Sequence, residues 1–266
     1  MKIISAVTIG ALTLGFSIAT ARADTATAAG NIELGDLVPE EVKTEVAPIA
    51  NLAAPNNLSV ELKIDELTGE GAHANSQVWS YRRLDNGLTN LVKQGIGSKN
   101  SDNVLTVCGL IDIITVRQTR MSRVVAFPVP IIESSNTDSI RKYGSLKADI
   151  AAICAPRADS SFSIEGTVLL DMNFSGTGGE RTINQRLDEK TSCHVGATPS
   201  PASTLVPGLT GDYLRVSCET SWSKLPAVRS EFVFLKDLGL YFPLSRDISP
   251  TIRSSFKIKH VDLMRK

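Results

Sequence analysis

The chain has 266 residues, with 28 Lys and Arg against 28 Asp and Glu, 42% hydrophobic residues and only 5% aromatic residues. This composition fits one large or two small globular domains. It excludes a mostly disordered chain, a collagen-like repeat and a helical membrane protein with several spans. The balanced charge also argues against a nucleic acid as partner, because a nucleic-acid binder needs surplus Lys and Arg to neutralise phosphates.

Residues 1–23 have the pattern of a cleaved signal peptide. Lys2 supplies a positive start, Ile3 to Thr20 is apolar and small, and Ala21-Arg22-Ala23 is an A-x-A cleavage site. A retained membrane anchor is the alternative, but the apolar segment is marginal in length for a span. We therefore expect a mature chain that begins at Asp24 in the periplasm or outside the cell, with a net charge near −2 and no stable insertion into the membrane.

Residues 24–57 are expected to form a flexible acidic arm rich in Ala and Pro, because they show no sustained hydrophobic periodicity. Within the arm, Pro39 followed by Glu40 and Glu41 favours the start of a short helix. Pro48 would end that helix after about two turns.

Patterns typical of β-strands dominate the remaining residues. Residues 58–65 alternate apolar and polar side chains, and Asp85-Asn86-Gly87 predicts a hairpin turn between strands at 78–84 and 88–94. The apolar run 104–116 predicts one central strand, bent at Gly109. Further strands are expected at 124–132, 162–174, 213–218, 230–235 and 252–263.

These strands, with turn signals between them and no sustained helical period, predict an all-β fold. We expect a disulfide-linked antiparallel β-sandwich, either as one unit or as two sandwich-like halves at 58–157 and 158–266, and a weak internal similarity favours two halves. An outer-membrane barrel is the less favoured alternative. The chain has only 8 Phe, 4 Tyr and 2 Trp to form aromatic girdles, and it ends on Leu263-Met264-Arg265-Lys266 rather than on an aromatic residue.

Four cysteines in an exported chain predict two disulfides. Three pairings are possible, and we favour Cys108 with Cys154 and Cys193 with Cys218 because each bond closes a loop within one half. The spacing contains no C-x-x-C, so neither a zinc site nor another cofactor is expected.

No motif predicts an enzymatic mechanism. The nucleophile elbow, the H-E-x-x-H zinc motif and the Walker loop are all missing from the sequence. Any histidine-dependent mechanism would have to use His73, His194 or His260. Asp112 is the most suggestive acid, because burial within its apolar run would raise the pKa of the carboxyl group. His73 is expected to be exposed in a polar loop, and His194 adjoins a predicted disulfide without an evident nucleophile. His260 shares its predicted strand face with Phe256 and Ile258, so packing is its simpler interpretation, and a structural role is the simpler interpretation of Asp112.

Three aromatic residues are candidates for binding. Trp79 and Tyr81 lie two residues apart on a predicted strand, so both rings share one face and could stack on a sugar or anchor a protein. Core packing is the alternative for this pair. Trp222 follows Thr220-Ser221 in a predicted loop and is the better candidate for an exposed aromatic ring.

The stretch 193–244 contains Cys218 and the segments Ala202-Ser203-x-Leu205, Gly211-Asp212-Tyr213-Leu214 and Leu238-Gly239-Leu240-Tyr241-Phe242-Pro243-Leu244. Through these residues it resembles exported proteobacterial proteins without an assigned activity. The resemblance implies a Gram-negative periplasmic address and a disulfide between Cys193 and Cys218.

Together these observations favour a non-catalytic periplasmic or secreted β protein that binds a protein or glycan partner of the cell envelope. Such a protein would use loops or an exposed sheet edge to capture its partner. Two alternatives remain: an envelope hydrolase acting on a glycan or ester, and a structural accessory of an envelope assembly or secretion complex.

Overall fold

The computed structural model describes residues 34–52, 58–68, 73–126, 130–176, 179–223, 225–249 and 252–265. The predicted signal peptide and the first part of the acidic arm lie outside these residues. The described helices are η1 (Leu34–Leu37), α1 (Glu40–Val46), η2 (Ala47–Asn51), α2 (Ile150–Cys154) and η3 (Ala202–Thr204). The strands are β1 (Leu58–Thr68), β2 (His73–Arg83), β3 (Thr89–Gly95), β4 (Ser101–Val107), β5 (Ile111–Ala126), β6 (Pro130–Ala148), β7 (Ser161–Gly176), β8 (Gly179–Val195), β9 (Ser200–Pro201), β10 (Asp212–Trp222), β11 (Leu225–Leu235), β12 (Leu240–Ser249) and β13 (Ile252–Arg265).

The fold is all-β and antiparallel, as predicted, but the expected sandwich is wrong. The strands follow the order β11-β12-β13-β1-β2-β3-β4-β5-β6-β7-β8-β10, and β10 pairs again with β11. The sheet therefore closes into a 12-strand β-barrel, with β9 as a short addition beside β10. Strands of a sandwich and of a barrel have the same alternation of apolar and polar residues, because alternation assigns faces and leaves the pairing of the sheet edges open.

The expected single strand 104–116 is also wrong, because the chain reverses in its middle. β4 and β5 pair antiparallel on either side of Cys108 and Gly109, whose φ angles are 50° and 79°. Positive φ at two successive residues is the geometry of a tight hairpin turn. A Cβ atom on Gly109 would lie 2.8 Å from the carbonyl oxygen of Tyr241, so glycine also permits a close approach to β12.

The β11–β12 hairpin fills one end of the barrel. β12 pairs with β13 only between Ser245 and Ser249, and nearer the turn both faces of the hairpin are buried. Phe234 and Tyr241 pack in a first core with residues of β5 to β8, whereas Val233 and Phe242, on the opposite face, pack in a second core with residues of β1 to β4. We call this end of the barrel, which holds the β4–β5 and β11–β12 turns, the closed end.

Backbone and side-chain contacts hold the inserted hairpin in place. Arg83 donates from Nη2 to the carbonyl oxygens of Leu238 and Gly239, both at 3.3 Å. The backbone N–H of Tyr241 donates to Cys108 O at 2.8 Å, and the Tyr241 hydroxyl donates to Ile153 O at 2.8 Å. The segments that supply these last two acceptors are linked by a disulfide.

Both predicted disulfides are confirmed. Cys108 is bonded to Cys154, which ties the β4–β5 turn to the end of α2 at the closed end. Cys193 is bonded to Cys218, and these two residues are directly opposite one another where β8 pairs with β10. The second disulfide therefore strengthens one seam of the barrel wall.

The helical segment η1–α1–η2 covers part of the outer surface of the sheet. The expected short helix is present as α1, which begins after Pro39. Its buried residues Val42 and Val46 belong to the first core together with Leu105 and Ile114 of β4 and β5. Glu45 accepts a hydrogen bond from the backbone N–H of Ala148 at 2.8 Å, which fixes α1 against β6.

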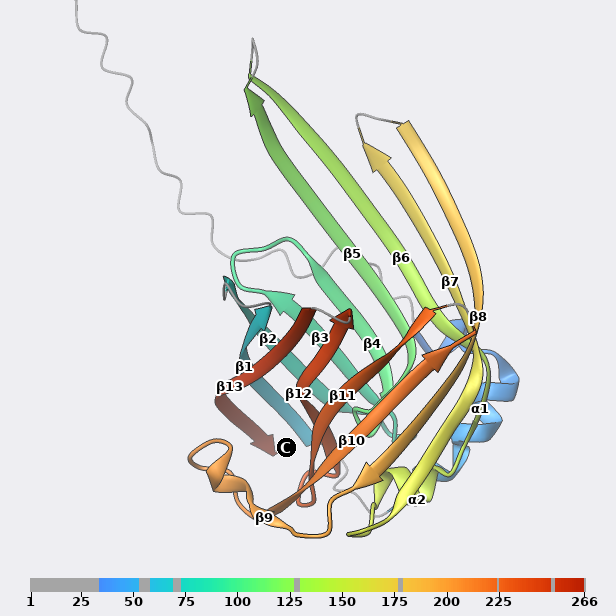
Figure 1. Cartoon of the computed structure of the whole chain (residues 1–266), viewed down its shortest axis with the longest axis vertical. Helices are drawn as coiled ribbons and strands as arrows, with labels where there is room; N and C mark the ends of the chain where they lie inside the picture. The colour runs from blue at the N-terminus through green and yellow to red at the C-terminus, as the bar shows by residue number, and fades with distance from the viewer. Residues whose placement is uncertain are drawn as a thin grey trace, which may run out of the picture. The chain divides into compact units, whose positions relative to one another are not determined.

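β5 to β8 are the longest strands of the barrel and extend well past the other strands at the end opposite the closed end (Figure 1). β6 and β7 pair from Ala148–Ile164 out to Ser135–Gly176, so the two hairpins form one continuous four-stranded sheet. We call this projecting part the extension, and the barrel end from which it rises the mouth.

Candidate functional site

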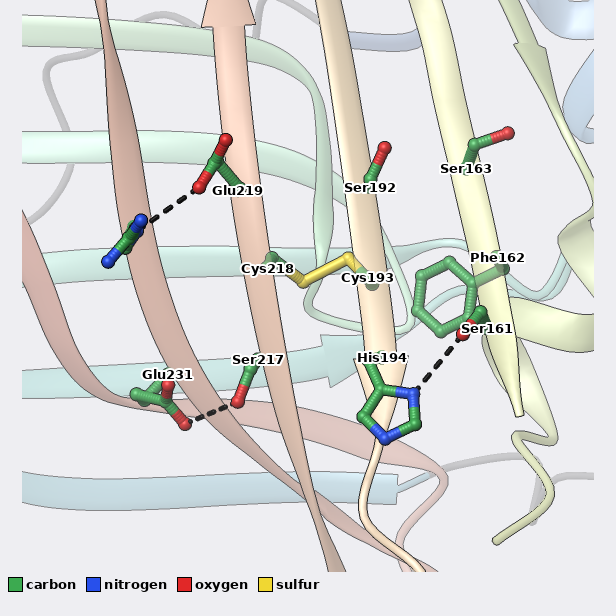
Figure 2. Close-up of a pocket in the computed structure, with 11 residues that line it drawn as sticks. Ser161, Phe162, Ser163, Ser192, Cys193, His194, Ser217, Cys218, Glu219 and Glu231 are labelled. Carbon is green, nitrogen blue, oxygen red and sulfur yellow. Dashed lines mark hydrogen bonds and ion pairs between the residues drawn. A yellow bond between two sulfur atoms is a disulfide. The ribbon is translucent and has the colours of Figure 1, made fainter. Parts of the chain in front are cut away.

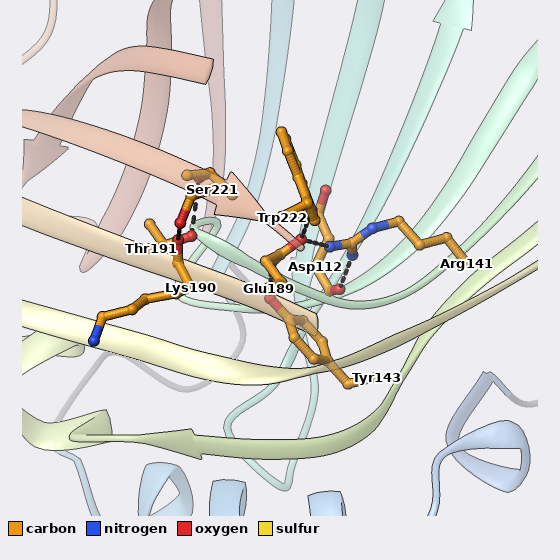
Figure 3. A network of polar contacts seen from close by, with 9 residues as sticks. Asp112, Arg141, Tyr143, Glu189, Lys190, Thr191, Ser221 and Trp222 are labelled. Atoms are coloured by element: carbon orange, nitrogen blue, oxygen red, sulfur yellow. Dashed lines mark hydrogen bonds and ion pairs between the residues drawn. The ribbon is translucent and has the colours of Figure 1, made fainter. Parts of the chain in front are cut away.

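A network of polar contacts converges on Glu189 at the base of the mouth (Figure 3). Glu189 of β8 is only 7% exposed and lies on the inner face of the barrel, two residues from Thr191 and four from Cys193. Arg141 of β6 donates from Nη2 to Glu189 Oε2 at 2.7 Å, and Trp222 of β10 donates from Nε1 to the same oxygen at 2.8 Å. The Tyr143 hydroxyl donates to Glu189 Oε1.

The protonation states of this network follow from burial and from the ion pair. Burial is the largest single influence on the pKa of Arg141 and lowers it, but the charges around the guanidinium group, first that of Glu189, and its hydrogen bond to Glu189 together raise that pKa above its usual value. Burial, followed by the charge of Glu189, raises the pKa of the Tyr143 hydroxyl. Arg141 also donates from Nη1 to the backbone carbonyl oxygen of Asp112 at 3.0 Å. The network therefore joins β5, β6, β8 and β10, and both oxygens of Glu189 are engaged, which suits positioning rather than proton transfer.

Two further arginines face the mouth. Arg117 makes a bidentate pair with Asp102, with Nε–Oδ1 and Nη2–Oδ2 distances of 2.9 and 2.8 Å. Arg246, which is opposite Ser230 and Ser254 in the sheet, makes no ion pair with any residue that the structure describes. Water reaches Arg246, yet desolvation by the surrounding protein lowers its pKa. Of the charges that act on Arg246, that of Asp112 is the largest and raises its pKa.

Apolar side chains continue from the network along the inner face of the extension. Leu170, Met172 and Phe174 of β7 share a face with the buried Val168, because alternate residues of a strand point to the same side. Met172 is directly opposite Ile183 of β8. All of these residues beyond Val168 are half-buried, and Met121 at the far end of the same face is 63% exposed.

The two faces of the extension differ in charge. Among the side chains that the structure describes beyond Glu189, the inner face carries Arg117, Arg141 and Arg181 and no Asp or Glu. The outer face of the same strands carries both signs. Its acidic residues are Asp138, Asp171, Glu180 and Asp188.

A second candidate is a shallow hollow of about 600 Å³ on the exposed face of β7, β8, β10 and β11, directly over the Cys193–Cys218 disulfide (Figure 2). Ser161 Oγ and His194 Nδ1 point toward one another at 3.2 Å, and Ser217 donates to Glu231 at 2.9 Å. A serine nucleophile needs a base that a third group orients. In the described part of the chain, no carboxylate is hydrogen-bonded to His194, so the hollow offers a polar surface rather than a catalytic triad.

The three predicted aromatic residues occupy different environments. Trp222 is the last residue of β10 rather than part of a loop, and it is half-buried beside Glu189. Trp79 and Tyr81 share one face of β2, as expected, and are 4% and 2% exposed in the second core. Trp79 contacts Phe256, with ring centroids 5.8 Å apart, and so Trp222 is the one member of this set at the mouth.

The other candidates from the sequence are dispersed. His260 was expected to share a face with Phe256 and Ile258, but a β-bulge opposite Lys63–Ile64 turns it outward, where it contacts Asp262 at 2.9 Å. The side chain of His73 lies outside the described residues. Asp112 is half-buried, and it takes part in the network through its backbone oxygen.

Sequence analysis missed Arg141, Glu189 and the inner face of the extension. The alternation of residues 162–174 contained part of the signal, because Phe174 and Met172 belong to it. In the described ranges, no three His, Cys, Asp or Glu side chains cluster as a metal site requires, and no helix there is long and apolar enough to cross a membrane. The two disulfides indicate an oxidising compartment outside the cytoplasm. No family model, curated protein or solved structure matches the chain.

Proposed function

We propose that this protein is a non-catalytic binding protein of the periplasm or the secreted fraction, and that it captures a partner of the cell envelope at the mouth of its barrel. The observation that carries this proposal is the inner face of the extension, where Leu170, Met172, Phe174 and Ile183 remain only half-buried beside three arginines. Apolar side chains that stay accessible next to placed polar groups are typical of binding surfaces.

The rest of the molecule supports binding more than catalysis. The closed end is filled by the β11–β12 hairpin, the Glu189 network is saturated with hydrogen bonds, and a cleaved signal peptide at residues 1–23 agrees with the disulfides. The outer face of β1 and β13 carries charged residues such as Lys63 and Lys257, which suits contact with water rather than lipid. Such a chain would act after export, as a free protein of the envelope.

A matched pair of variants tests this proposal. Phe174→Asp places a charge on the inner face of the extension, and Asn173→Asp places the same charge one residue away on its outer face. The tagged full-length protein and both variants are produced with their own leader and recovered from the cell envelope. Bound proteins, glycans and lipids are then identified by mass spectrometry.

Capture by the wild type and by Asn173→Asp, together with loss of capture in Phe174→Asp, is the expected result. Equal capture by all three proteins would place the binding surface elsewhere. No capture by the wild type would overturn the proposed function. Far-ultraviolet circular dichroism of each variant establishes that the barrel is still folded.

A further inference from the structure

We propose that two copies of this chain associate through the edge of β8 in the extension, as a symmetric antiparallel strand pair centred on Ile183. This inference goes beyond the proposed function, because it concerns one edge of the extension rather than the ligand of its inner face. Its basis is a long strand edge whose side chains are complementary to the same edge of a second copy.

One side of β8 has no strand partner along the extension. The pairing of β8 with β10 ends at Glu189, opposite Trp222, and in the part of the chain that the structure describes no strand pairs with Gly179–Leu187 on that side. We call this side of Gly179–Leu187 the free edge; it is the outermost edge of β8 in Figure 1. Lysine, proline and β-bulges commonly protect strand edges from pairing. Gly179–Leu187 contains neither residue and pairs with β7 without a bulge.

The backbone of the free edge offers hydrogen bonds to a further strand. The carbonyl oxygen of Asp188 accepts from the backbone N–H of Ser223, the residue after β10, at 3.2 Å, so Asp188 directs its backbone groups away from β7. Every second residue of a strand directs its N–H and C=O groups to the same side. The residues of the free edge with outward backbone groups are therefore Glu180, Thr182, Asn184 and Arg186.

An antiparallel copy of the free edge, centred on Ile183, is complementary to it. Glu180 then lies opposite Arg186 of the second copy, and the symmetry creates this pair twice. Both side chains are exposed on the outer face. Opposite charges on directly facing residues stabilise a strand pair. Thr182 faces Asn184 of the second copy, and on the inner face the half-buried Ile183 faces its own counterpart.

The charges and the length of the free edge select this register. Shifts are possible only in steps of two residues, because the outward backbone groups must face one another. One shift places Glu180 opposite Asp188, which has the same charge, and brings Gly179 of the second copy to Glu189, where β10 already occupies the edge. The opposite shift places Glu180 opposite Asn184 and removes both ion pairs.

The resulting interface is closed and small. The same edge is used by both copies, so the pair forms a dimer and does not add further copies. Because the two strands are antiparallel, the two barrels lie at opposite ends of the joined sheet. One strand from each copy makes a small interface, and we therefore expect a dimer that dissociates on dilution.

Charge reversal tests the pairing in solution. The full-length protein is produced with its own leader and purified, and sedimentation equilibrium measures the dissociation constant of the dimer. Glu180→Arg and Arg186→Glu should each weaken the dimer about tenfold or more, because like charges then face one another twice. A mixture of the two variants should form a heterodimer about as stable as the wild-type dimer, because each arginine then faces a glutamate.

A single cysteine tests the centre of the pair. Ile183→Cys places two thiols directly opposite one another, as Cys193 and Cys218 are between β8 and β10, where their Cα atoms are 4.1 Å apart. With oxidised glutathione as the oxidant, this variant should form a covalent dimer on a non-reducing gel. Gln185→Cys, on the same face of the strand, is the matched control and should not, because its two thiols would lie about 13 Å apart along the strands.

Several results would overturn this inference. They are a wild type that stays monomeric at every concentration, a dimer that neither charge variant weakens, and equal cross-linking from positions 183 and 185. Open-ended oligomers would also overturn it, because they require pairing between two different edges. Circular dichroism establishes that each variant is folded. Envelope capture is measured separately, so failure of the dimer leaves the proposed function standing.

Discussion

Replacing Glu189 with alanine should destabilise the barrel by about 3 kcal/mol. The change removes three hydrogen-bond partners at once, and the two neutral donors, the Tyr143 hydroxyl and the Trp222 indole, account for about 1 kcal/mol each. The charged bond from Arg141 accounts for about 1 kcal/mol more, because its side chain is 30% exposed and water recovers part of the loss. For a folded unit of this size, the sum corresponds to a melting temperature lowered by about 6–12 °C.

The assay is urea unfolding of the oxidised protein followed by circular dichroism, with Glu165→Ala as the matched control. Glu165 forms an ion pair with Lys190 at 2.8 Å on the outer face of β7 and β8, where both side chains are about half exposed, so its loss should not change stability measurably. Glu189→Gln retains one acceptor oxygen and should fall between the two. If Glu189→Ala and Glu165→Ala unfold at the same urea concentration, the network does not stabilise the mouth and our reasoning is refuted.

Three other predictions concern the closed end and the barrel wall. Replacing both Cys108 and Cys154 with serine opens a loop of 46 residues and should lower the free energy of unfolding by about 4 kcal/mol. An unchanged midpoint of urea unfolding would contradict the stabilising role of this disulfide. Of the four tyrosines, only Tyr213 should ionise at or below its ordinary pH in an ultraviolet absorbance titration. Burial raises its pKa, but its hydrogen bonds and the charge of Arg215 together lower it further, whereas burial raises the pKa of the other three. Tyr81, Tyr143 and Tyr241 therefore stabilise the folded state below about pH 10, and this contribution is lost as the pH rises further. Simultaneous ionisation of all four tyrosines in the folded protein would disprove the prediction. Gly166→Ala should destabilise the folded protein by about 2 kcal/mol, because the new Cβ would lie 2.3 Å from the carbonyl oxygen of Ser145. Gly35→Ala is the control and should not destabilise the protein, because Gly35 has open space around it. Equal thermal stability of the two variants would rule out the clash.

Local structure was predictable wherever a single pattern determined it. Residues 58–65 form β1 because their alternation leaves one apolar face, and the turn at Asp85-Asn86-Gly87 forms the expected hairpin, with Leu84 N bonded to Leu88 O at 2.8 Å. The prediction of a single strand at 104–116 was wrong, because continuous apolar residues occur both in one buried strand and in a hairpin that is buried on both faces. A turn at Cys108 interrupts no hydrophobic pattern, so only its backbone angles reveal it.

Closure of the barrel depends on pairing between distant strands, which no local pattern encodes. The segments 232–235 and 238–242 are apolar at almost every position, which is typical of strands buried on both faces. Only a strand at 230–235 was expected there, and the structure shows the whole element to be the inserted β11–β12 hairpin between the two cores.

The candidate site was harder to predict because its members come from separate strands. Arg141 and Glu189 are 48 residues apart and lie in polar sequence, so neither is conspicuous. The sequence showed that one face of β7 is apolar. The part of this face beyond Val168 stays accessible only because β5 to β8 are longer than their neighbours in the barrel. Strand length relative to a partner is a property of the assembled sheet.

The most direct test of a binding mouth is photo-cross-linking in intact cells from two adjacent positions of β7. A photoreactive phenylalanine analogue replaces Met172, on the inner face of the extension, or Asn173, on its outer face. The account predicts that illumination attaches an envelope component to position 172 and leaves position 173 unmodified. Cross-links from position 173 alone, or equally from both positions, would contradict it.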